Sequence, residues 1–334
     1  MSIAFERTTQ TASFYSPLAD FESVDVEVEV RTDPLTARRA RIVPESFLMA
    51  EDPDIEAVVG DAEGCFFCPG TVEKVTPEYP DWVGMDRGSV GEATSFPNLN
   101  PYGAYSNVVA LTEAHFTPID AFAPEQFRDG LAAALEYVAA VQAHDEAARF
   151  ASVNMNFLRP AGSSIIHPHL QTLVDDRGTN RGAELVRAAR TYHADHDATY
   201  WDDLREAERD GDRWVGSTGP VDWLAPFAPL HHRQVIGVAA EPGVPGPDDQ
   251  VVEALATGLV NVLRYYGDVG LNAFNLALHL VRDEPAMVPV VEIVARSVFD
   301  AYYWSDSPFF TVLHGEGVVD EAPEAVAAGA CAFF

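Results

Sequence analysis

Lysine is almost absent from this sequence: Lys74 is the only lysine among 334 residues, and 52 acidic residues face 21 basic ones. The formal net charge is −31, and the acidic residues are spread along the whole chain. A surface of this kind repels polyphosphates, which excludes nucleic acid as a partner. It suits molar salt, where the Debye length falls to about 3 Å, so we expect the protein to come from a halophilic microbe.

Long apolar runs and disulfide-forming cysteines are also lacking. No run reaches the ~18 apolar residues of a membrane span, and residues 1–20 lack the features of a secretory signal. We therefore expect no membrane partner and a cytoplasmic location. Three cysteines, Cys65, Cys68 and Cys331, are too few for a disulfide framework, which agrees with a reducing compartment.

The hydrophobic patterns predict an α+β protein with an antiparallel sheet. Hydrophobic residues make up 47% of the chain, enough for a large core, and we favour two domains, residues 1–205 and 206–334. The second half repeats the strand, helix, strand order of the first. The predicted strands include residues 21–30, 107–112, 152–157, 223–229, 234–238, 273–281 and 288–295. The predicted helices are residues 123–150, 177–213, 248–266 and 321–334.

Cys65 and Cys68 form a Cys-x-x-Cys pair followed by Pro69 and Gly70, a turn that can direct two sulfurs at one metal ion. The spacing alone also fits thiol redox chemistry. No thioredoxin-like strand, helix, strand pattern follows the pair, and histidines that could complete a tetrahedron lie downstream. The pattern therefore favours zinc.

The most informative stretch places His167, His169 and Gln171 two residues apart. On a β-strand these three side chains share one face, and we expect the strand to run through residue 174. Directly before them lie Gly162, Ser163 and Ser164. Such a run can form a tight turn whose N–H groups and hydroxyls face an anion. Turn, imidazoles and amide together indicate a phosphate-handling site.

Four arginines lie within residues 31–41 of a chain that is otherwise poor in positive charge: Arg31, Arg38, Arg39 and Arg41. They could bind an anionic substrate, because guanidinium groups match phosphate and carboxylate geometry. They could equally pair with surface acids, and the sequence leaves both interpretations open.

Together these motifs resemble the galactose-1-phosphate uridylyltransferase family, the transferase branch of the histidine-triad superfamily. Five motifs occur in that family's order over most of the chain: Arg-x-Asp-Pro-Leu-Thr at 31–36, Cys-x-x-Cys-Pro-Gly at 65–70, His115 after a strand, Asn156 before a turn, and His-Pro-His-x-Gln at 167–171. The resemblance implies two histidine-triad-like halves that form an open antiparallel half-barrel flanked by helices. It also implies a homodimer.

The resemblance further implies roles for individual residues. Cys65, Cys68, His115 and His167 match ligands of a structural Zn²⁺ ion, and His169 matches the catalytic nucleophile. Gln171, catalytic in our prediction, and Ser164 match phosphate contacts, and further substrate-binding residues are expected at Arg31, Asn156, Gly162 and Ser163. Some members hold a second metal with a glutamate and three histidines. His279 and Glu184 could serve there, but His231, His232 and His314 do not fall in register, so no second site is predicted.

We therefore predict a nucleotidyltransferase that exchanges a nucleoside monophosphate, by default UMP, between a nucleotide sugar and a hexose 1-phosphate through a covalent histidine intermediate. A UDP-glucose–hexose-1-phosphate uridylyltransferase of galactose metabolism is the first choice. One alternative is a phosphorylase that acts on a nucleotide sugar or a dinucleoside polyphosphate with the same histidine. The other is a zinc-stabilised nucleotide-binding protein without turnover.

Overall fold

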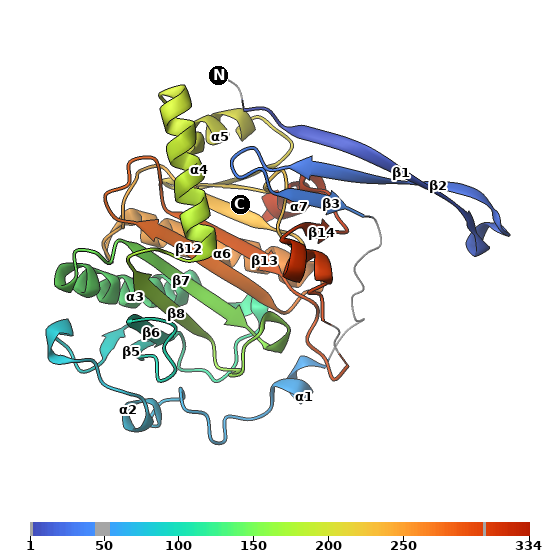
Figure 1. Cartoon of the computed structure of the whole chain (residues 1–334). Helices are drawn as coiled ribbons and strands as arrows, with labels where there is room; N and C mark the ends of the chain where they lie inside the picture. The colour runs from blue at the N-terminus through green and yellow to red at the C-terminus, as the bar shows by residue number, and fades with distance from the viewer. Residues whose placement is uncertain (1–2, 44–53, 303–304) are drawn as a thin grey trace.

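A computed structural model describes residues 3–43, 54–302 and 305–334 (Figure 1). Within these ranges the largest element is a ten-stranded sheet in the order β4-β5-β6-β8-β7-β12-β13-β11-β10-β9. Every neighbouring pair in it is antiparallel, which confirms the predicted α+β class. Its strands are β4 Gly88–Val90, β5 Ala93–Pro97, β6 Tyr105–Ala110, β7 Phe150–Phe157, β8 His169–Asp175, β9 Trp214–Thr218, β10 Val221–Leu224, β11 Val235–Ala239, β12 Phe274–Val281 and β13 Val290–Ala295.

The same arrangement occurs twice along this sheet. In each half three strands precede a long helix and two follow it, and the two orders, β4-β5-β6-β8-β7 and β9-β10-β11-β13-β12, correspond strand for strand. The halves meet where β7 pairs with β12, so one sheet runs through both. The division at residues 205 and 206 stays a prediction, and it falls within helix α5. The helices are α1 Ile55–Val59, α2 Val72–Val75, α3 Pro124–His144, α4 Asn180–His196, α5 Tyr200–Glu208, α6 Gln250–Asp268 and α7 Pro323–Ala330.

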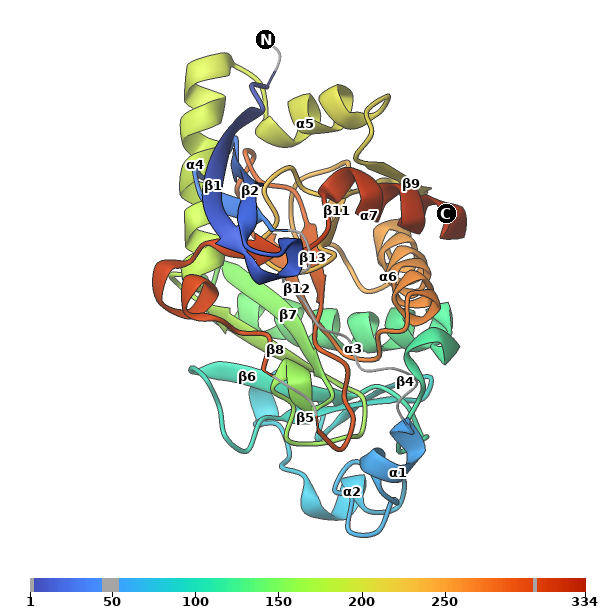
Figure 2. The same ribbon diagram turned by 90° about the vertical axis from the view of Figure 1, so that its right-hand side faces the viewer.

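Helices α3 and α6 cover one face of the sheet, and α4 lies on the other (Figures 1 and 2). The predicted helix at 123–150 is α3, which begins at Pro124 as expected and buries Phe127, Leu131 and Leu135. Because side chains alternate along a strand, Leu170 and Val174 of β8 point into this helix-covered core. His169 and Gln171 therefore lie on the opposite face. No helix in the described ranges is both long and apolar enough to cross a membrane.

A second sheet of four strands has the order β1-β2-β3-β14, formed by β1 Glu6–Ser16, β2 Glu22–Thr32, β3 Arg39–Ile42 and β14 Gly317–Val319. The hairpin of β1 and β2 projects from the body of the protein as an arm (Figure 1). The strand expected at 21–30 is β2. The alternation of valines with acidic residues in it predicts one buried face, and that prediction is wrong. Val26 is 39% exposed and Val24 and Val28 are half-buried, because nothing in the described chain covers the outer arm.

The strand expected to carry both histidines begins later than predicted, at His169. Pro168 has no N–H to donate to a sheet, and only its carbonyl continues the pattern, by accepting from Leu111 N at 2.9 Å. His167 consequently lies in the irregular segment before β8. As a result, His167 lies in a loop, whereas His169 lies in the sheet. The helix expected at 177–213 is likewise two helices, α4 and α5, which are separated at Asp197 in the left-handed conformation.

Candidate metal centre and active site

Four predicted metal ligands come together at one point of the structure. Cys65 and Cys68 lie in the turn before α2, His115 follows β6, and His167 precedes β8. Their ligand atoms all lie within 4.8 Å of one another. The Nδ1 atom of His167 is 3.6 Å from each sulfur, and Nδ1 of His115 is 3.6 Å from Cys68 Sγ. A tetrahedral ion with Zn–S of about 2.3 Å and Zn–N of about 2.1 Å requires S···N separations of about 3.6 Å, so the donor set fits zinc.

Hydrogen bonds and burial prepare His167 for this role. Its Nε2 lies 2.7 Å from the carbonyl oxygen of Thr112, which can only accept, so Nε2 carries the proton and the Nδ1 lone pair faces the sulfurs. Burial lowers the pKa of His167 to about 4, which keeps the ring neutral as a ligand must be. Burial, with the neighbouring Cys65 sulfur, raises the pKa of Cys68 to about 11. A cation bound between the sulfurs would lower it again.

His169 is held as a neutral ring with a defined tautomer. Its Nδ1 donates to the backbone oxygen of His167 at 2.8 Å, which leaves the lone pair on Nε2. The side chain is buried, and burial lowers the pKa of His169. Phe67, from the turn between the two cysteines, packs edge-on against the ring. The arrangement offers an unprotonated nitrogen whose direction is fixed.

Gln171 and Asn156 lie on the same face of the sheet as His169. Gln171 is two residues further along β8 and is half-buried. Asn154 of β7 is its direct partner across the strands, so Asn156, two residues along β7, shares that face next to His169. Asn154 Nδ2 donates to the backbone oxygen of Gln171 at 3.2 Å and fixes this part of the ladder. Two amides and one imidazole are thus presented together on the face opposite α3.

The turn at residues 162–164 uses most of its donors internally. Gly162 has φ of +89°, and its N–H donates to Arg159 O, while the N–H of Ser163 donates to Leu158 O. The Ser163 hydroxyl donates to Ile165 O at 2.6 Å. Ser164 is exposed, and of the three residues it keeps the donors that could reach a phosphate.

The structure does not group Arg31 with these residues. Arg31 is 2% exposed and makes a two-pronged ion pair with Glu324 of α7, each bond 2.9 Å long, while its guanidinium lies over the Phe227 ring. Arg38 pairs with Glu184 and Arg41 with Glu316. Three of the four clustered arginines are therefore held by carboxylates of this chain. Arg31 as a substrate contact stays a prediction.

His279 and Glu184, considered above for a second metal, are bound to other partners. Glu292 accepts from His279 Nε2 at 3.0 Å and from Arg181 at 2.7 Å, and Arg181 also pairs with Glu184. Burial raises the pKa of Glu292, but Arg181 and His279 outweigh it and hold that pKa well below its ordinary value. The Arg181 guanidinium therefore supplies the positive charge that a second metal ion would bring to this place. In the described residues, the Cys65 cluster is the one group with metal-ligand geometry.

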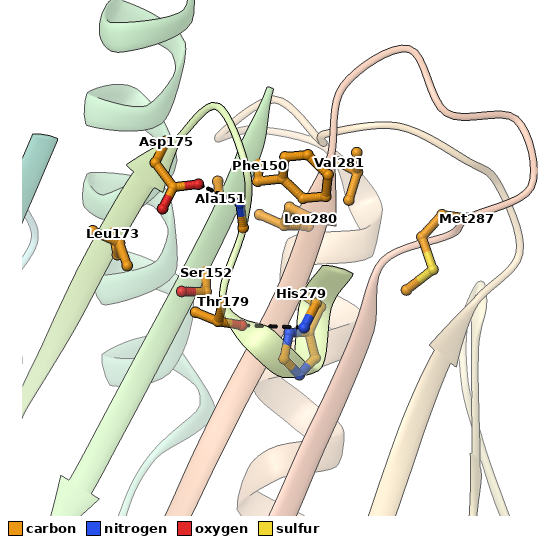
Figure 3. A pocket seen from close by; sticks show the side chains of 12 residues that line it. Phe150, Ala151, Ser152, Leu173, Asp175, Thr179, His279, Leu280, Val281 and Met287 are labelled. Atoms are coloured by element: carbon orange, nitrogen blue, oxygen red, sulfur yellow. Dashed lines mark hydrogen bonds between the residues drawn. The ribbon is translucent and has the colours of Figure 1, made fainter. Parts of the chain in front are cut away.

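Figure 3 shows a small cavity beside His279, between the start of α4 and strands β7, β8 and β12. Its volume is about 10 Å³, which is room for about one water molecule and not for a substrate. The lining includes Ser152, Thr179 and the apolar side chains of Phe150 and Met287. None of the residues predicted to bind the nucleotide lines this cavity.

Comparisons with known proteins agree with this fold. No protein-family model matches the chain. An uncharacterized protein of Archaeoglobus fulgidus is 35% identical over 298 residues, which cover 89% of each chain. Among solved structures, an ADP-glucose phosphorylase from Arabidopsis thaliana with bound ADP-glucose has a TM-score of 0.71 at 16% identity, over 91% of this chain and 98% of that one. A uridylyltransferase has a TM-score of 0.67 at 20% identity, over 91% and 97%.

In fold the protein belongs to the class of these two structures, the ADP-glucose phosphorylase and the uridylyltransferase, which confirms the fold that the motif resemblance implied. Within this class, the identity of 35% over nearly nine-tenths of both sequences shows that the chain belongs to one family with the Archaeoglobus fulgidus protein.

Proposed function

We propose that the protein transfers a nucleoside monophosphate from a nucleotide sugar to a phosphorylated or phosphate acceptor through a covalent intermediate on His169. The observation that carries this proposal is the tautomer of His169. Its Nδ1–H is bound to the His167 carbonyl, so the Nε2 lone pair faces the side of the sheet where Gln171 and Asn156 present amides. A neutral imidazole with one free nitrogen is a good nucleophile near pH 7.

The reaction divides one displacement into two. Nε2 of His169 forms a bond to the α-phosphorus, and the bond from that phosphorus to the sugar 1-phosphate oxygen breaks, the oxygen leaving with the electron pair. The His167 carbonyl supports the positive charge that develops on the ring. An acceptor oxygen then attacks the phosphorus, and the P–N bond returns its electrons to Nε2. Gln171 and Ser164 would donate hydrogen bonds to the non-bridging oxygens.

We propose that Cys65, Cys68, His115 and His167 hold a zinc ion with a structural role. Four protein ligands leave no open position, so the ion would supply rigidity. Fixing His167 also fixes the carbonyl that orients His169.

Two acceptors have support. A hexose 1-phosphate, with UDP-glucose as donor, follows from the family resemblance and makes the protein a hexose-1-phosphate uridylyltransferase. Inorganic phosphate is the second, because one structural neighbour is an ADP-glucose phosphorylase. Both reactions begin with the same attack by His169. The identity of the nucleotide base and the identity of the acceptor therefore have to be determined separately.

Mass spectrometry of the intact protein after incubation with UDP-glucose or ADP-glucose tests the proposal. We expect an added mass of UMP or AMP, which identifies the transferred group. Addition of galactose 1-phosphate or of inorganic phosphate should then remove the adduct and show the acceptor. His169→Ala should form no adduct but keep its metal content and melting temperature, and Gln171→Ala should react about 10²–10³-fold more slowly. Full activity of His169→Ala would eliminate the covalent mechanism.

We also propose that the protein works as a homodimer in which the β1–β2 arm is covered by a second copy. Phe14, Leu18 and Phe21 of the arm are 47%, 98% and 70% exposed. A two-stranded ribbon alone is marginally stable in water, so contact with a second copy would stabilise it. Light scattering should give twice the chain mass, and a monomer at micromolar concentration would contradict this.

A further inference from the structure

A continuous chain of side-chain hydrogen bonds links the proposed active site to the C-terminal half. Asn156 of β7 is paired with Asn275 of β12, where the two halves meet. Asn275 Nδ2 lies 2.6 Å from Asn156 Oδ1 and 2.8 Å from the backbone oxygen of Ala161. On its other side, Asn275 Oδ1 lies 2.6 Å from Nη1 of Arg296.

The donors and acceptors of this chain permit one orientation. A guanidinium only donates, so the group of Asn275 that faces Arg296 must be the amide oxygen. The NH₂ group of Asn275 then faces Asn156 and Ala161, and the Ala161 carbonyl, which only accepts, agrees with this. The atom of Asn156 that meets this NH₂ group must be its oxygen. The NH₂ group of Asn156 is therefore left over, and within the described part of the chain no group accepts from it.

Arg296 is itself held by several hydrogen bonds, so the donor-to-acceptor order of this hydrogen-bond chain is fixed. Its Nε donates to Asp306 Oδ2 at 2.9 Å and its Nη2 to Asp306 Oδ1 at 2.5 Å. Asp306 also accepts from the N–H of Ser297 at 2.7 Å, and its side chain is 1% exposed. Because its carboxylate partner is buried, Arg296 cannot turn without breaking several charge-assisted hydrogen bonds.

We propose that Arg296 and Asn275 are positioning residues that turn the side-chain N–H of Asn156 toward the phosphoryl group transferred at His169. The inference rests on the proposed function. The group recognised is a negatively charged phosphoryl oxygen, which an amide N–H attracts and an amide oxygen repels. Asn275 also ties down Ala161, the residue before the turn at residues 162–164. The C-terminal half thus sets the polarity of a site whose other residues come from the N-terminal half.

Asn275→Asp and Asn275→Ala separate orientation from packing. The Asp side chain can accept from Arg296 but has no N–H for Asn156, so the Asn156 amide turns its NH₂ group inward and its oxygen toward the substrate. Alanine leaves Asn156 free to adopt either direction. With UDP-glucose and ADP-glucose as probes, we expect single-turnover adduct formation to be about tenfold slower in Asn275→Asp than in Asn275→Ala. Equal rates in the two variants would overturn the proposal.

A double-mutant cycle removes the objection that a new carboxylate repels substrate by itself. If Asn275→Asp acts through Asn156, it should have little further effect in an Asn156→Ala background. A full additional loss in that background assigns the effect to charge or folding and overturns the positioning role. Metal content and melting temperature, measured for every variant, identify a folding defect.

If Asn275→Asp does not fold, Arg296→Lys and Arg296→Met decide the question. Lysine only donates and should keep the rate within about threefold of wild type, whereas methionine should lower it about tenfold. Equal rates in the two would contradict the positioning role. If wild type forms no adduct with either probe, the proposed function fails. The same cycle is then measured as affinity for UMP and AMP, where coupling between positions 156 and 275 supports the positioning role and independent effects overturn it.

Discussion

The ring of Phe67 packs edge-on against the ring of His169, with centroids 5.3 Å apart and planes at 68°. Phe67 lies between the two cysteines of the metal cluster and is 9% exposed, whereas its neighbour Phe66 is 59% exposed. The turn that presents the sulfurs therefore also presents the ring that closes one side of His169. This contact joins the candidate metal centre to the proposed nucleophile.

Phe67→Ala should weaken both stability and chemistry. Loss of a buried aromatic ring costs about 3 kcal/mol of unfolding free energy, and an uncovered His169 should form the adduct about tenfold more slowly because its ring direction is less fixed. Phe66→Ala is the matched control and should change neither property noticeably. Denaturant melts measure the stability, and intact-mass kinetics measure adduct formation. Equal effects of the two changes would refute the role of this contact.

Cys65→Ser should abolish stoichiometric zinc binding and lower the melting temperature, because a serine hydroxyl is a poor zinc ligand and the ion contributes to folding. Elemental analysis and thermal melts measure the two effects. Cys331 is exposed and outside the cluster, so Cys331→Ser should keep both metal and stability. Retention of one zinc per chain by Cys65→Ser would show the ligand set to be wrong.

The elements with regular patterns could be predicted from the sequence. Helix α3 is an example: its residues Phe127, Leu131 and Leu135 recur at helical spacing after Pro124, and all three are buried. The sequence does not predict strand β1, because Glu6–Ser16 is polar and lacks alternation, and it is a strand only through its pairing with β2.

The candidate site is likewise only partly predictable from local sequence patterns. His167 and His169 are close in sequence, and their motif identifies them. Asn156 and Asn275 are 119 positions apart, and they meet only because β7 pairs with β12. Likewise Arg31 finds Glu324 at a separation of 293 positions. Such partners depend on the order of strands in the sheet, which local patterns do not determine.

Glu324→Gln should show how Arg31 contributes to stability. Burial raises the pKa of Glu324, but hydrogen bonds from Arg31 and Arg213 outweigh it and bring that pKa to about 2. A folded pKa below the unfolded value near 4.5 means that the carboxylate stabilises the fold fully above about pH 5, and that this contribution disappears as the pH falls toward 2. We expect Glu324→Gln to cost about 1–2 kcal/mol at pH 7.

The cost should shrink between pH 5 and pH 2, and urea titrations across that range measure it. Glu206 is exposed and serves as control, since Glu206→Gln should leave stability unchanged at every pH. A pH-independent difference for Glu324→Gln would show that its carboxylate is not held by the arginines.

Salt should stabilise this protein through screening of its own surface. With a net charge of −31, exposed carboxylates repel one another, and the range of that repulsion falls from about 10 Å at 0.1 M salt to about 3 Å at 1 M. The melting temperature should therefore rise with KCl, most steeply below 1 M. A variant with amides at four exposed acids should be more stable in dilute salt and gain less from KCl. The four positions are Glu27, Asp195, Asp210 and Glu241. Equal melting temperatures of wild type in 0.1 M and 2 M KCl would mean that repulsion does not limit its stability.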